Sequence, residues 1–222
     1  YVIQFTKKGR VAYISHLDLQ RLFLRVFRAA EMKPAYSSGF NPHPKLGLAL
    51  PLSTGFSSDC EYLEVETDAA PSAVAERLRG RMPEGIEIRN VWEKETWERD
   101  VAGAGGGKSL ASRVRFAEYE IIAPSFAGVE TALETYLRKD AILIEKESRK
   151  TKRISRVDIR PLISAFECVR VFNRLVQFRC TLAAGGDKNL NPLTLMESFY
   201  ESSGLAFDAD AFDVRRTRIL FT

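Results

Sequence analysis

One ten-residue segment, Tyr36–Lys45 (YSSGFNPHPK), combines residue types that can bind anions or transfer protons. The imidazole of His43 can bind or transfer a proton, Lys45 carries a positive charge, and Asn41 can both donate and accept hydrogen bonds. The prolines on either side of His43 fix φ and restrict the residue before each of them, so the polar groups stand on a stiffened backbone. Stiffening reduces the entropy lost on binding, which favours a binding site over a plain turn.

A second candidate surface belongs to a helix that we expect over Leu17–Met32, directly after the sequence SHLD. At 100° per residue its apolar side chains gather on one face, and Arg21, Arg25 and Arg28 fall on the opposite face. Such a row of guanidinium groups can bind phosphates or an acidic partner, or it can be an ordinary solvated face. His16, at the helix start, could be a general base, a metal ligand or a packing residue.

A third candidate is the strongly basic segment Lys146–Arg160, which has seven basic and two acidic residues, a net charge of +5 (7 − 2). Clustered lysine and arginine are typical of contact with nucleic-acid phosphates, although a solvated hairpin has the same composition. Few aromatic residues accompany them, so we expect contact with the backbone rather than base reading. The residues predicted to bind nucleic acid here are Lys150, Lys152, Arg153, Arg156 and Arg160.

Neither histidine belongs to a recognised catalytic or metal-binding motif. Metal-independent RNA cleavage needs a base near a 2′-hydroxyl and a cation for the transition state. His16 or His43 could serve as that base, and these two are the candidate catalytic residues. Arg21 or Lys45 could serve as the cation. The glycine-rich stretch 102–109 (AGAGGGKS) lacks the buried strand and helix that a phosphate-binding loop requires. We therefore predict no cofactor and no metal.

The elements that must position these groups form two similar halves. The first half has the order βαββαβ, and the second repeats it with one extra strand; this is the order of a ferredoxin-like unit. We predict an α+β fold of two tandem ferredoxin-like units with antiparallel sheets, at residues 1–93 and 113–222, joined by a flexible Gly-rich linker at 94–112. Val11–Ile14 is among the expected strands.

Composition places the chain among globular domains and adds little about its partner. Of 222 residues, 33 are basic and 29 acidic, and a net charge of +4 is too small to prove a nucleic-acid partner. Three widely spaced cysteines indicate buried thiols in a reducing, cytoplasmic compartment. No apolar run approaches the roughly 18 residues of a membrane span. Tyr1 already lies in an expected strand, which suggests a trimmed chain or a piece of a longer protein.

The motifs SHLD, SGFNPHPK, PLSTG and RVDIRPLI (156–163) closely resemble those of the radical SAM-associated domain of unknown function, also called radical SAM-linked protein. The resemblance spans nearly the whole chain. It implies a bacterial companion to radical-SAM chemistry that acts on RNA, either alone or fused to a radical-SAM domain. It supplies no established catalytic residues.

Together these patterns lead to one main hypothesis and two alternatives. The main hypothesis is a non-catalytic accessory domain that binds tRNA or rRNA for a radical-SAM enzyme, in trans or in the same polypeptide. The first alternative is a metal-independent endoribonuclease. The second is a protein-docking module whose basic surface meets a radical-SAM partner.

Overall fold

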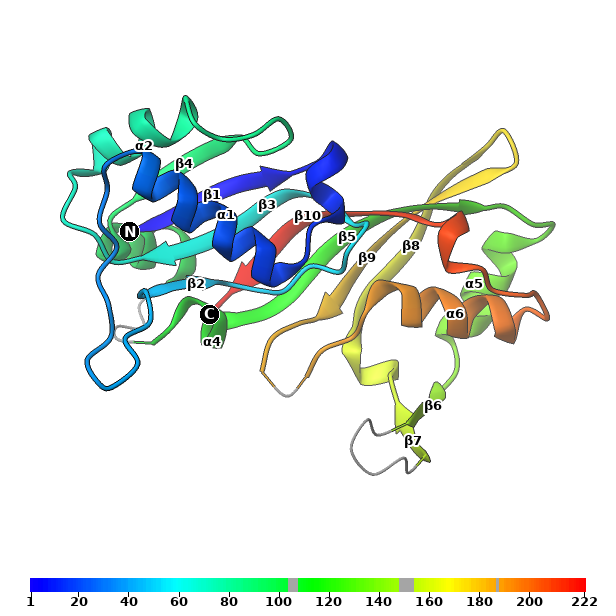
Figure 1. The fold of residues 1–222 in the computed structure, drawn as a ribbon. Helices are drawn as coiled ribbons and strands as arrows, with labels where there is room; N and C mark the ends of the chain where they lie inside the picture. The colour runs from blue at the N-terminus through cyan, green and yellow to red at the C-terminus, as the bar shows by residue number, and fades with distance from the viewer. Residues whose placement is uncertain (104–107, 148–153, 187) are drawn as a thin grey trace. The chain divides into compact units, whose positions relative to one another are not determined.

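The computed structural model describes residues 1–103, 108–147, 154–186 and 188–222 (Figure 1). The chain forms two compact units, the first made of residues 1–116 and 215–222 and the second of residues 117–214. The fold is α+β, and most of the strand pairs are antiparallel, as expected. None of the helices in the described ranges is long and apolar enough to cross a membrane.

The sheet of the first unit is built around two neighbouring strands. β1 (Val2–Lys7) lies between β3 (Ser57–Val65) and β4 (Ile88–Trp92) and is antiparallel to both. The short β2 (Leu46–Leu48) pairs antiparallel with β3. β10 (Asp213–Phe221) arrives from the end of the sequence and pairs parallel with β3.

Helices α1 (His16–Ala29) and α2 (Pro71–Arg79) accompany this sheet. α1 begins where Ser15 accepts a hydrogen bond from the Asp18 backbone N–H at 3.1 Å, which satisfies one of the free N–H groups of the first turn. It ends before Glu31, whose φ of 54° breaks the helical path. The remaining helical segments are a 3₁₀ turn at Gly9–Tyr13, α3 (Lys94–Trp97), a π turn at Glu98–Ala102 and α4 (Leu110–Arg113).

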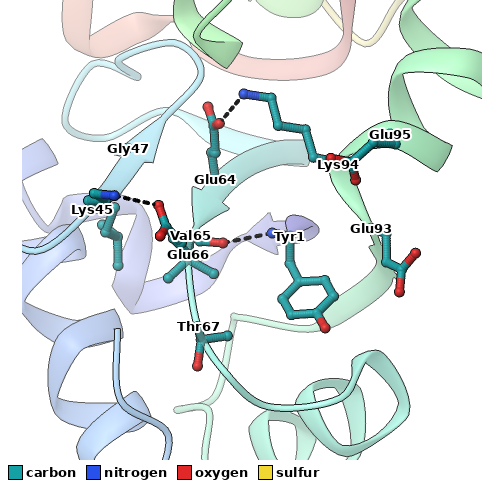
Figure 2. Close-up of a pocket in the computed structure, with 11 residues that line it drawn as sticks. Tyr1, Lys45, Gly47, Glu64, Val65, Glu66, Thr67, Glu93, Lys94 and Glu95 are labelled. Atoms are coloured by element: carbon teal, nitrogen blue, oxygen red, sulfur yellow. Dashed lines mark hydrogen bonds and ion pairs between the residues drawn. The ribbon is translucent and has the colours of Figure 1, made fainter. Parts of the chain in front are cut away.

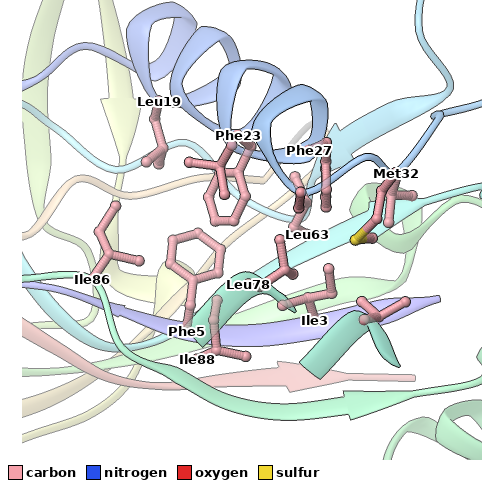
Figure 3. Close-up of a cluster of buried hydrophobic side chains, with 14 of the residues drawn as sticks. Ile3, Phe5, Leu19, Phe23, Phe27, Met32, Leu63, Leu78, Ile86 and Ile88 are labelled. Carbon is pink, nitrogen blue, oxygen red and sulfur yellow. The ribbon is translucent and has the colours of Figure 1, made fainter. Parts of the chain in front are cut away.

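The core of the first unit lies between the apolar face of α1 and the sheet (Figure 3). Phe23 of α1 meets Phe5 of β1 edge to face, with ring centroids 4.8 Å apart. Burying aromatic and aliphatic side chains of this size contributes about 1.5–3 kcal/mol each. Because the apolar face of α1 is buried in the core, the arginines on its other face are exposed to solvent.

The second unit has the strand order β5-β9-β8, formed by β5 (Val114–Pro124), β9 (Leu175–Ala183) and β8 (Ile163–Phe172). β8 and β9 form a hairpin whose turn residues, Asn173 and Arg174, have φ of 47° and 62°. The other elements are α5 (Val129–Leu137), α6 (Pro192–Ser202), 3₁₀ turns at Arg160–Leu162 and Ala209–Ala211, and a separate hairpin of β6 (Leu143–Glu147) and β7 (Ile154–Asp158).

Part of the segment 94–112, where the sequence predicts a flexible linker, makes buried contacts within the first unit. Trp97 is fully buried and meets the ring of Phe221 at 4.9 Å between centroids. Arg113, 1% exposed, pairs with Glu98 at 3.3 Å and donates to the backbone oxygen of Thr222 at 2.9 Å. These contacts fix segments whose polar, glycine-rich composition predicted flexibility; residues 104–107 lie outside the described ranges.

Two further expectations differ from the structure. Val11–Ile14, an expected strand, falls mostly in a 3₁₀ turn, because the Lys7 side chain binds the carbonyls of Ala12 and Ile14 at 2.9 and 3.2 Å. The expected boundary after residue 112 also moves, since residues 215–222 belong to the first unit. The local sequence pattern of β10 does not indicate which distant strand it pairs with.

Candidate nucleic-acid interface

The arginine row occupies the exposed face of α1. Arg21 pairs with Asp18 at 2.9 Å, and both side chains are more than half exposed. Hydrogen bonds from Ser15 and Arg21 lower the pKa of Asp18. Arg25 and Arg28 are exposed and form no ion pair with any of the residues that the structure describes. They are therefore the members of the row whose charge is available to a phosphate.

Two arginines of the α2 region extend this row at the C-terminal end of α1. Arg81 donates through Nε to the Ala29 carbonyl at 3.1 Å, and Arg77 donates to the Ala30 carbonyl at 3.5 Å. Cations are favoured there because the last carbonyls of a helix carry partial negative charge. The contacts bring both guanidinium groups next to the helix turn that carries Arg28. The sequence signal was AERLRGRM, but its relation to α1 depends on tertiary packing.

The segment 36–45 is a closed turn held by backbone hydrogen bonds. Tyr36 and Pro44 form an isolated β-bridge, the Ser37 N–H donates to the His43 carbonyl at 2.8 Å, and the His43 N–H donates to Ser37 Oγ at 3.0 Å. Asn41 and His43 are exposed, and the side chain of Phe40 is fully exposed. The turn thus presents polar and aromatic groups from a backbone with few alternative conformations.

The arginine row and the turn meet at one hollow of about 330 Å³. Arg28 comes from α1 and Tyr36 from the start of the turn, and Lys33 lies between them in sequence. The inner wall includes Met32, which is 2% exposed. The complete lining is Leu24, Arg28, Met32, Lys33, Pro34 and Tyr36. This hollow combines cations, an aromatic ring and an apolar wall within the first unit.

Lys45 faces a different hollow, of about 630 Å³, with the opposite charge (Figure 2). Its ammonium group pairs with Glu66 at 2.8 Å, and Lys94 pairs with Glu64 at 2.5 Å. With Glu93 and Glu95, four glutamates and two lysines line this space. Because carboxylates outnumber the cations, this part of the surface disfavours a polyanion, and Lys45 is the predicted site residue least suited to bind one.

His16 is half-buried beside a group of buried charges on the first unit. Burial lowers the pKa of His16; Lys7 lowers it further, and Glu61 opposes both. Burial likewise lowers the pKa of Lys7. Glu61 is bound by Arg216 through bonds of 2.9 and 3.1 Å, with each side chain 2% exposed. The lowered pKa favours the neutral form of His16, the form that a general base requires.

The two histidines have different surroundings. The charges of Glu61 and Lys7 act on His16, whereas the backbone N–H of His43 donates to Ser37 Oγ at 3.0 Å within the turn. Within the described ranges no three His, Cys, Asp or Glu side chains gather as a metal site would require.

The basic segment belongs to the second unit. Arg156 of β7 lies 3.8 Å from Glu145 of β6, and both are largely exposed. Arg160 is half-buried at a 3₁₀ turn, where its backbone N–H donates to Asp158 at 2.9 Å. Lys150, Lys152 and Arg153 lie outside the described residues. The described parts of the segment therefore lie in two paired strands and the turn after them, with one arginine next to a carboxylate.

Comparison with known proteins supplies a family and a fold. A family model described as "Uncharacterized protein conserved in bacteria (DUF2344)" matches residues 1–192. The chain is similar to a chain in "Crystal Structure of a Cbf5-Nop10-Gar1 Complex", with 12% identity, a TM-score of 0.52, and coverage of 98% of this chain and 48% of that one. A chain in "Structure of H/ACA RNP bound to a substrate RNA containing 2'-deoxyuridine" has 12% identity, a TM-score of 0.47 and coverage of 98% and 47%.

The first of these likenesses is one of fold alone, because the identity is low. The chain spans about half the length of the protein chains it matches. The comparison with curated proteins returned no match.

Proposed function

We propose, from the premise that this chain belongs to the family of uncharacterized proteins conserved in bacteria (DUF2344), that it is a non-catalytic RNA-binding accessory protein. The observation that carries the proposal is the hollow at which Arg28, Lys33 and Tyr36 meet. Arg25, Arg77 and Arg81 extend the positive charge around it. Guanidinium and ammonium groups that lack carboxylate partners can neutralise phosphates and release their counterions on binding.

The RNA class that we propose is tRNA or rRNA, and the partner is a radical-SAM enzyme, separate or fused. This partnership rests on the sequence motifs SHLD, SGFNPHPK, PLSTG and RVDIRPLI. Asn41 and His43 would contact the same RNA from the turn, and the basic hairpin with Arg156 and Arg160 would add phosphate contacts from the second unit. Arg21 would contribute less, because Asp18 already offsets its charge.

The architecture that we propose for this role is a pair of ferredoxin-like units. The spatial order β4-β1-β3 with β2 paired to β3 supports it in the first unit, since the split βαβ arrangement interleaves strands in this way. The order β5-β9-β8 supports it in the second unit, where β5, β8 and β9 would take the first, second and third strand positions.

Equilibrium binding of bulk tRNA over a series of salt concentrations tests the RNA proposal. We expect log K to fall linearly with log salt, and Arg28→Ala to reduce the slope by about one. Arg89→Ala is the matched control, because Arg89 is an exposed arginine on β4 that pairs with Glu87 at 3.1 Å. Absence of binding at low salt, or an affinity that does not depend on salt, overturns the proposal.

The half-buried position of His16 and its lowered pKa favour one alternative, a metal-independent endoribonuclease. Incubation of tRNA with the wild-type chain and with His16→Ala in the presence of a chelator distinguishes the two functions. Cleavage that disappears in the variant supports the endoribonuclease, and intact RNA with both proteins supports the accessory role. Retention of a radical-SAM protein after ribonuclease treatment indicates direct protein docking instead of assembly through RNA.

A further inference from the structure

The hollow beside α1 has the composition of a base-binding site as well as a phosphate-binding site. Its wall is apolar, formed by Leu24, Met32 and Pro34, and Tyr36 contributes an aromatic ring. Arg28 and Lys33 are exposed at the same hollow, where they are accessible to a ligand's phosphates. A phosphate alone needs cations and no apolar wall, so the wall implies a ligand that also carries a flat, weakly polar surface.

The turn adds a second aromatic group in an unusual state. Phe40 is fully exposed, whereas Phe5, Phe23 and Phe27 of the same unit are fully buried. An exposed phenyl ring on a stiff turn offers a face on which a base can stack, and such stacking tolerates any base because every base has a π-face. Tyr36 and Phe40 are four residues apart in this turn, which the Tyr36–Pro44 bridge closes.

Base pairing and the shape of the A-form helix make duplex RNA a poor fit to these groups. In a duplex the bases are stacked on one another, and the protein reaches mostly phosphates and 2′-hydroxyls. An aromatic ring can stack only on a base that is unpaired and turned outward. Tyr36 beside Arg28 and Lys33 in the hollow, with the exposed Phe40 on the same turn, therefore favours an unpaired base over a duplex.

We propose that this hollow receives an unpaired base of single-stranded RNA, stacked on Tyr36, while Arg28 and Lys33 hold the flanking phosphates and Phe40 stacks on a neighbouring base. The proposal rests on the RNA-binding function proposed above and specifies its substrate class. The ligand is a loop, a bulge or an end of a structured RNA, and the sequence of the base is read weakly.

The test is a binding measurement with a short single-stranded RNA that carries one 2-aminopurine, and with the same strand annealed to its complement. We expect the single strand to bind more tightly and the 2-aminopurine fluorescence to be quenched on binding. Tyr36→Ala should weaken binding by about 5- to 150-fold, the range that loss of one base–aromatic stack produces. Tyr36→Phe should retain both affinity and quenching, since it keeps the ring.

Tyr13→Ala is the matched control, because Tyr13 is 71% exposed and lies in the 3₁₀ turn at Gly9–Tyr13, away from the hollow's lining. It should leave affinity and quenching unchanged. The proposal is overturned by the following combined result. Single and double strands bind equally, Tyr36→Ala and Phe40→Ala bind like the wild type, and Arg28→Ala still weakens binding. Loss of binding to every RNA by the wild-type chain instead refutes the RNA function itself.

Discussion

Replacement of Arg216 by methionine should destabilise the first unit by several kcal/mol. Arg216 donates to both oxygens of Glu61, at 2.9 and 3.1 Å, and to the carbonyls of Pro51 and Leu50, at 2.8 and 3.4 Å. Methionine fills a similar volume but donates no hydrogen bond. The variant therefore leaves two carbonyls and the Glu61 carboxylate, whose side chain is 2% exposed, without this donor.

Removal of one member of a buried ion pair typically costs about 3–5 kcal/mol, because the remaining charge is not solvated. Removal of both members by apolar residues is often close to neutral. We therefore expect Arg216→Met to lower the free energy of unfolding by about 3–5 kcal/mol, and Glu61→Leu combined with Arg216→Met to recover most of that loss. Arg215→Met is the control, since Arg215 is 44% exposed and lies 3.6 Å from Asp59; its cost should stay below about 1 kcal/mol.

Urea unfolding followed by tryptophan fluorescence provides the assay. Trp97 is buried against Phe221, and Phe221 lies on β10, the strand that also carries Arg216. Circular dichroism at each urea concentration checks that the fluorescence change reports unfolding. A loss of unfolding free energy below about 1 kcal/mol in Arg216→Met refutes the argument. So does a loss in the double variant that equals or exceeds the sum of the losses of Arg216→Met and Glu61→Leu measured singly.

Three further predictions test other parts of the first unit. Gly85→Ala should destabilise it by about 1–3 kcal/mol or more, measured as a lower urea midpoint, because φ is +93° and a Cβ would lie 2.2 Å from the Lys8 carbonyl; Gly80→Ala, where nothing lies within 4 Å, is its control. Ser15→Ala should cost about 1 kcal/mol by removing the α1 N-cap, and Ser15→Thr, which keeps the hydroxyl, should retain most of that stability; equal midpoints for all three proteins contradict this. NMR titration should place the pKa of His16 below 6.5. Because the unfolded chain then binds a proton at a higher pH than the folded chain, the free energy of unfolding should fall as pH drops through and below 6.5. A His16→Gln variant should lose this part of the pH dependence, and an unchanged pH profile in that variant contradicts the prediction.

The parts of the fold that the sequence predicted are those set by local pattern. The spacing of Leu19, Phe23, Val26 and Phe27 determines which face of α1 is buried, and hence which face carries the arginines. Prolines and glycine in 36–45 indicated a stiff, exposed turn, and the hydrogen bonds of that turn agree. Each of these signals lies within a few residues of the feature that it predicts.

The parts that the sequence did not reveal depend on partners distant in the chain. Lys45 appeared available for binding until the pairing of β2 with β3 placed Glu66, 21 residues away, within 2.8 Å. The roles of Arg77 and Arg81 appear only when α2 lies against the end of α1. The predicted linker was wrong in its described parts because Trp97 and Arg113 find their partners, Phe221 and Thr222, at the far end of the sequence.

The parallel pairing of β10 with β3 has a consequence for biosynthesis. Arg216 follows Glu61 by 155 residues, so a ribosome that adds about 5–20 residues per second needs about 8–31 s to add Arg216 after Glu61. During that interval the nascent first unit carries an open strand edge and an uncompensated acid. The first unit is therefore completed only after the intervening residues have been translated.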